Sequence, residues 1–227
     1  MEKMKYSVES SKSKGAKQYM APFVSLVVNI FMAFVVYLIA RVAFLLENFS
    51  YFSEGLSFSQ VGEWFWGGYI FDRSAITYTN SLYIVMMLFP LWMKERRDYH
   101  LLCKWVFVVV NTLTLVINLC DAVYFPYTLR RTTTSVFREF SNENNLLDVF
   151  WGELWGHWYL LLLAIAVVWL MWKLYLMPRT NHTYYATLGS RIGFGVVQLL
   201  LLLAITPLAI GACRGGLESG IRPITVN

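Results

Sequence analysis

Five long apolar stretches alternate with polar, charged or aromatic segments along the chain. Each is close to the ~20 residues that an α-helix needs to cross ~30 Å of hydrocarbon. Their patterning is helical rather than alternating, and a helix pairs its own backbone polar groups in lipid. The pattern therefore predicts an all-α polytopic membrane protein with five transmembrane helices. The stretches are Phe23–Leu46, Ile76–Met93, Leu101–Phe125, Trp158–Met177 and Ile192–Ala212.

Two connections on the predicted outer side, residues 47–75 and 126–157, are rich in aromatic residues. Rings with a polar edge are typical of the membrane interface, so the first connection is interpreted as an aromatic belt, with sugar or lipid binding as the alternative. In the second, apolar residues recur at helical spacing, which predicts an amphipathic helix on the outer face. These residues are Leu146, Leu147, Phe150, Trp151, Leu154, Trp155 and Trp158.

The lysines set the predicted orientation, because basic residues next to membrane spans favour the cytoplasmic side. All of them fall in the N-terminal tail (residues 1–20) or beside the second-to-third and fourth-to-fifth connections: Lys3, Lys5, Lys12, Lys14, Lys17, Lys94, Lys104 and Lys173. The N-terminus is therefore predicted to be cytoplasmic, and the five-helix domain (21–213) leads to an extracytoplasmic C-terminus. The net charge of +5 is interpreted as a topology signal, so no nucleic-acid partner is predicted.

The sequence offers no self-sufficient set of catalytic residues. The three histidines fall on different connections and lack zinc-type spacing, and no P-loop, Ser-His-Asp set or carboxylate cluster is visible. The three cysteines lack CxxC spacing, and a bridge between Cys120 and Cys213 is left open. This chain alone is predicted to be non-catalytic and to carry no cofactor or metal.

Polar residues inside a membrane helix are costly, so they indicate where a function could lie. Asn111, Thr114, Asn118 and Asp121 are spaced by three, four and three residues, which places them on one stripe of the third predicted helix. One interpretation is hydrogen bonding between helices that fixes the packing. The other is a polar seam that receives a lipid headgroup from the outer leaflet.

Charged residues gather near the outer ends of the predicted spans. Guanidinium groups bind phosphate in bidentate fashion, so these residues are candidates for holding a phospholipid headgroup. Snorkelling and Arg–Asp pairing explain Arg41 and Arg73 equally well. No acidic residue lies in the middle of a predicted span, which argues against a proton or cation pump. The candidates are Arg41, Asp72, Arg73, Asp121, Arg130 and Arg131.

Several short motifs resemble the membrane region of lipoteichoic acid synthase-like proteins, the phosphoglycerol or phosphoethanolamine transferases of the sulfatase/alkaline phosphatase superfamily. The resemblance runs from the first helix to Asn227. The motifs are Gly68-Tyr69-Ile70-Phe71-Asp72-Arg73-Ser74-Ala75-Ile76 followed by Asn80, Asp121-Ala122-Val123-Tyr124-Phe125 with Arg130-Arg131, Arg214-Gly215-Gly216, and Arg222-Pro223-Ile224.

The resemblance implies a membrane anchor that presents lipid to an extracytoplasmic catalytic domain. In the family that domain uses a threonine nucleophile and a divalent metal. Residues 214–227 would begin the linker to it, and no catalytic residue is carried over to this chain. The expected location is the cell inner (plasma) membrane, the expected partners are membrane lipids and the catalytic domain, and the parent protein would be a transferase or hydrolase. A non-enzymatic scaffold or a small transporter is the alternative.

Overall fold

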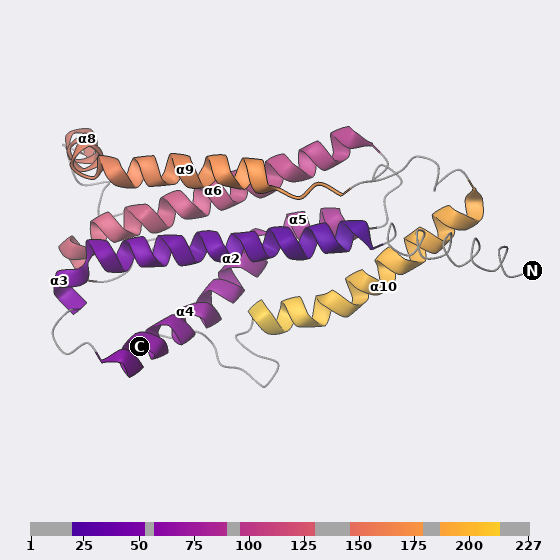
Figure 1. Ribbon diagram of the computed structural model, residues 1–227, viewed down its shortest axis with the longest axis horizontal. Coiled ribbons are helices and arrows are strands. Elements are labelled where there is room, and N and C mark those ends of the chain that lie inside the picture. Colours follow the sequence, from indigo (N-terminus) through magenta and orange to yellow (C-terminus); the bar gives the residue numbers. More distant parts are fainter. Residues whose placement is uncertain (1–19, 53–56, 90–95, 130–145, 179–186, 214–227) are drawn as a thin grey trace, which may run out of the picture. The chain divides into compact units, whose positions relative to one another are not determined.

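The computed structural model describes residues 20–52, 57–89, 96–129, 146–178 and 187–213. Over these ranges the chain forms α-helices and short connections without a β-strand, which confirms the all-α prediction for this part of the chain. The polar tail and residues 214–227 lie almost wholly outside the described ranges. The helices are α2 (Ala21–Glu47), α3 (Phe49–Phe52), α4 (Phe58–Thr79), α5 (Ser81–Leu88), α6 (Arg97–Thr128), α8 (Leu146–Gly156), α9 (Trp158–Leu174) and α10 (Leu188–Cys213) (Figure 1).

The chain divides into two compact units. Each of α2, α4 and α6 is split, with one part in unit 1 and the other part in unit 2. Within unit 1, α5 packs against α10, and within unit 2, α8 contacts α9. Unit 1 consists of Met1–Ala33, Tyr69–Phe107 and Tyr175–Asn227, and unit 2 consists of Phe34–Gly68 and Val108–Leu174.

Three of the described helices, α2, α6 and α10, are long and apolar enough to cross a membrane, and α9 is a shorter apolar helix of 17 residues. Large apolar side chains point outward along the long helices. Phe31 is 68% exposed, Ile117 61% and Leu203 60%. Outward-facing apolar surface of this kind fits a lipid environment better than water. The helices are compatible with a multi-pass membrane protein.

The second predicted span does not form one continuous helix. It was expected over Ile76–Met93, but α4 ends at Thr79, Asn80 adopts φ −92° and ψ 9°, and only then does α5 begin. Thr79 Oγ1 donates a hydrogen bond to the Ala75 carbonyl at 2.9 Å, and Asn80 Nδ2 donates to the Ile76 carbonyl at 3.1 Å. Side chains that bond to helix carbonyls often bend a helix, and here the bend leaves the backbone bonds from Asn80 N–H to the Ile76 carbonyl and from Ile84 N–H to the Asn80 carbonyl in place, both at 2.9 Å. The prediction of continuity is therefore wrong at Asn80.

The other helices follow the apolar stretches with shifted ends. α9 ends at Leu174, before the predicted Met177, and residues 175–178 leave the helix. α8 covers most of the segment in which an amphipathic helix was predicted. α4 begins at Phe58, inside residues 47–75, which the sequence predicts to be an outer connection. Helix periodicity in the sequence thus located elements better than it located their ends.

A buried asparagine organises unit 1. Asn29 has no exposed surface, and its Nδ2 donates to the Tyr83 hydroxyl at 2.8 Å and to the Leu176 carbonyl at 3.0 Å. Its Oδ1 accepts from the Leu176 backbone N–H at 3.0 Å. The rings of Tyr83, Phe107 and Tyr175 pack together, with centroids 5.0 to 6.3 Å apart. One amide side chain therefore pairs both backbone groups of a residue that has left its helix.

Candidate functional site

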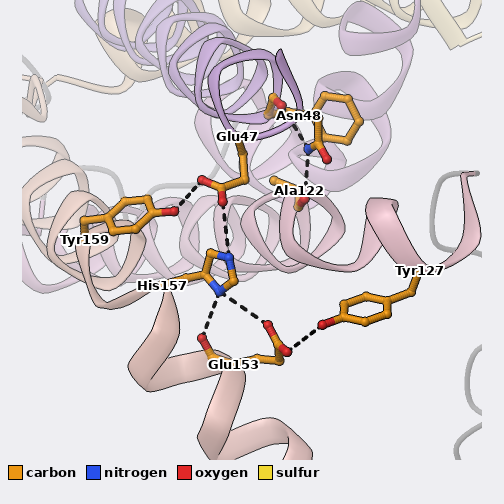
Figure 2. A network of polar contacts seen from close by, with 8 residues as sticks. Glu47, Asn48, Ala122, Tyr127, Glu153, His157 and Tyr159 are labelled. Carbon is orange, nitrogen blue, oxygen red and sulfur yellow. Dashed lines mark hydrogen bonds and ion pairs between the residues drawn. The ribbon is translucent and has the colours of Figure 1, made fainter. Parts of the chain in front are cut away.

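The polar site in unit 2 begins where α2 ends. Asn48, which follows Glu47, is fully buried, and its Nδ2 donates to the Phe44 carbonyl at 3.0 Å and to the Ala122 carbonyl of α6 at 2.9 Å (Figure 2). The Ala122 carbonyl needs this partner because residue 126, four positions later in α6, is a proline and has no N–H. Asn48 therefore joins the end of α2 to α6.

Aromatic packing supports the same junction. The Phe125 ring lies 5.1 Å from Phe44, 6.1 Å from Tyr51 and 5.6 Å from Phe52, measured between ring centroids. Phe52 in turn meets Trp64 of α4 at 5.5 Å. Aromatic pairs at these separations add to the stabilisation that burial provides. The end of α2, which carries Glu47, is thus stabilised both by the hydrogen bonds of Asn48 and by this aromatic packing.

His157 stands at the turn between α8 and α9, between two carboxylates. Its Nε2 lies 3.2 Å from Glu47 Oε1, and its Nδ1 lies 3.4 Å from Glu153 Oε2 and 3.1 Å from the Glu153 carbonyl oxygen (Figure 2). Figure 1 shows α8 viewed nearly end-on beside the start of α9, so the chain turns sharply at this histidine. The turn brings a residue of α8 and the end of α2 to the two sides of one imidazole ring.

Two tyrosines complete the cluster. The Tyr159 hydroxyl donates to Glu47 Oε2 at 2.6 Å, and the Tyr127 hydroxyl donates to Glu153 Oε1 at 2.7 Å (Figure 2). Each carboxylate therefore uses one oxygen for a tyrosine and the other for His157. We refer to Glu47, Tyr127, Glu153, His157 and Tyr159 as the carboxylate–histidine cluster.

The cluster places an imidazole ring between two carboxylates, but it is not arranged as a metal site. The side chains of Glu47, His157 and Glu153 are 18%, 26% and 34% exposed, so none of them is fully buried. The two carboxylates approach opposite nitrogens of the ring instead of converging on one point. Among the residues the structure describes, no group of three or more His, Cys, Asp or Glu side chains could hold a metal ion.

Of the six residues proposed to bind a headgroup, Arg41 has the most distinctive environment. Its guanidinium lies against the α4 backbone at Gly68, where an added Cβ would overlap with the guanidinium atoms. A side chain larger than hydrogen at position 68 would therefore push Arg41 aside. Gly68 is also the first residue of the first motif that resembles the transferase family.

The other candidate residues belong to different units or lie outside the described residues. Asp121 is 6% exposed in the unit 2 part of α6, whereas Asp72 and Arg73 lie in the unit 1 part of α4. Arg130 and Arg131 lie outside the described residues. The grouping of these six residues around one headgroup therefore stays a prediction.

The polar stripe of α6 makes hydrogen bonds within its own helix. Thr114 Oγ1 lies 3.1 Å from the Asn111 carbonyl and 3.3 Å from the Val110 carbonyl, and Asn118 Nδ2 donates to the Thr114 carbonyl at 2.8 Å. Asn111 is fully buried. These contacts explain how two of the stripe residues are tolerated in an apolar helix.

Sequence reasoning did not find the carboxylate–histidine cluster. Glu153 and His157 are four residues apart, a spacing that places them together on a helix, and this was the only local signal. Glu47 is 110 positions from His157 in the sequence, and Tyr127 belongs to a third helix, so their meeting depends on tertiary packing. Cys103 and Cys120 form no disulfide in the part of the chain that the structure describes.

Comparison of the chain with protein-family models, with curated proteins and with solved structures finds no match.

Proposed function

We propose that the chain is the membrane anchor and lipid-presenting domain of a lipoteichoic acid synthase-like transferase of the sulfatase superfamily. In this proposal five spans cross the cell inner (plasma) membrane, and the α4–α5 pair forms the second of them. The N-terminus is cytoplasmic, and α8 lies along the outer face. In the same proposal, transfer of the lipid headgroup and the divalent metal that it uses belong to a catalytic domain that is separate from residues 1–227.

The observation that carries the proposal is the placement of Arg41. An ionisable residue within an apolar helix is costly, so its presence indicates a functional position. Arg41 is half-buried in α2, and the absence of a side chain at Gly68 makes room for its guanidinium. A planar guanidinium with several N–H donors is suited to a lipid phosphate.

The test is lipid binding by the purified chain in nanodiscs that contain phosphatidylglycerol and phosphatidylcholine. We expect the wild type to retain phosphatidylglycerol preferentially through detergent extraction, as measured by native mass spectrometry. Arg41→Gln should reduce that preference on the order of tenfold, because hydrogen bonds to a charged group contribute about 1.5 to 3 kcal/mol. Gly68→Ala keeps the arginine but displaces it, and should cause a smaller reduction in the same direction.

Lys173→Gln is the matched control, because it removes one positive charge from the same unit. Lys173 lies over the Trp169 ring at 5.9 Å in the last turn of α9. It should leave the preference for phosphatidylglycerol unchanged. Equal losses in Arg41→Gln and Lys173→Gln, or no preference in the wild type, would contradict the headgroup site and favour the scaffold or transporter alternative.

A further inference from the structure

The surroundings of the His157 ring determine how many protons the cluster needs. Within the described ranges, the atoms in hydrogen-bonding reach of its two nitrogens are oxygens of Glu47 and Glu153. A neutral imidazole carries only one N–H, so its other nitrogen would direct a lone pair at one of these oxygens. Both contacts are favourable only with one additional proton, either on the ring or on a carboxylate that then donates to it.

The tyrosines do not supply that proton. Tyr159 uses its hydroxyl hydrogen on Glu47, and Tyr127 uses its own on Glu153. Glu47 and Glu153 are both acids, so loss of the additional proton leaves two negative carboxylates around a neutral ring.

We propose that His157 is a proton-dependent latch that holds α8 against the end of α2 and releases it when the cluster loses its additional proton. His157 is the member of the cluster that contacts both Glu47 and Glu153. Tyr159 links α9 to α2, and Tyr127 links α6 to α8, so neither replaces the α2–α8 connection. The groups that face the ring come from α2 (Glu47), α8 (Glu153) and α9 (Tyr159), with Tyr127 of α6 behind Glu153.

Release would move an aromatic helix. Trp151 is 53% exposed and Trp155 is 74% exposed on α8, and such side chains favour the membrane interface. α8 ends at Gly156 and α9 begins at Trp158 as a separate helix, so movement of α8 does not require movement of α9. The latch would therefore couple the position of α8 to the pH on its side of the membrane. This inference does not rest on the proposed transferase function.

The test measures the distance between α2 and α8 in the full chain in nanodiscs. Spin labels are placed on Val42→Cys and Gly152→Cys after the native cysteines are replaced by alanine. Val42 is 40% exposed, and a Cβ at Gly152 meets no atom within 4 Å. We expect one narrow distance distribution at about pH 5.5 and a broader, longer one at about pH 8.5, on either side of the range in which imidazole ordinarily changes charge.

His157→Gln should give the same distribution at both pH values, because glutamine does not take up the proton. His182→Gln removes a different histidine and should keep the wild-type response. An unchanged distribution in the wild type between the two pH values would overturn the latch without reliance on any variant at the cluster. Retention of the full response in His157→Gln, or its loss in His182→Gln, would also overturn it.

Discussion

Replacing Asn29 with leucine is expected to lower the free energy of unfolding by about 2 to 4 kcal/mol, since a buried group left without its partner costs about 1 to 3 kcal/mol. The leucine has a similar size but cannot pair with the N–H and C=O of Leu176. Both groups lie where the chain has left α9, so no helix partner is available to replace Asn29. Thermal unfolding of the purified chain in detergent measures the loss.

Two further variants separate the parts of this effect. Tyr83→Phe removes the hydroxyl that Asn29 contacts at 2.8 Å, together with its 3.3 Å contact to the Tyr175 hydroxyl, and leaves the Asn29–Leu176 pair intact, so it should cost about 1 kcal/mol. Val28→Ala alters the neighbouring residue of α2, which is 42% exposed, and should have little effect. A loss in Asn29→Leu no larger than that in Val28→Ala would contradict the structural role assigned to the amide.

The sequence predicted helices where hydrophobic periodicity is long and uninterrupted. The apolar stretches at Phe23–Leu46 and Leu101–Phe125 lie within α2 and α6, because burial in lipid or protein and backbone pairing favour the same conformation there. At Asn80 the same reasoning failed, since periodicity does not report side-chain hydrogen bonds to the helix backbone. Those bonds are local, but several conformations satisfy them, and the sequence does not choose between them.

The candidate site was predicted less well than the fold. The stripe through Asn111 and Asn118 was visible because helical spacing alone places its residues on one face. The contacts of Asn29 with Leu176, and of His157 with Glu47, join residues more than a hundred positions apart. Such pairs depend on how helices pack, and single-sequence patterns carry almost no information about them. The charge of Arg41 makes it a candidate in the sequence, whereas its contact with Gly68 depends on tertiary packing.

Replacing Asn48 with leucine is expected to cost about 2 to 3 kcal/mol, because the Ala122 carbonyl would be left buried without a donor. In most helices this carbonyl would accept a hydrogen bond from the backbone N–H of the residue four positions later. Here that residue is Pro126, so Asn48 Nδ2 at 2.9 Å substitutes for the missing donor. The Phe44 carbonyl is less affected, since it also accepts from the Asn48 backbone N–H at 3.1 Å.

Pro126→Ala tests this explanation directly, because it restores a backbone N–H opposite the Ala122 carbonyl. In that background Asn48→Leu should cost about 1 kcal/mol less than in the wild type, a coupling that a double-mutant cycle of thermal unfolding measures. Asn118→Leu is the matched control: Asn118 Nδ2 donates to the Thr114 carbonyl at 2.8 Å, but that carbonyl also faces the backbone N–H of residue 118 itself. Its cost should be small and independent of Pro126. Equal costs of Asn48→Leu in both backgrounds would mean that Asn48 acts through packing rather than by replacing the donor that proline removes.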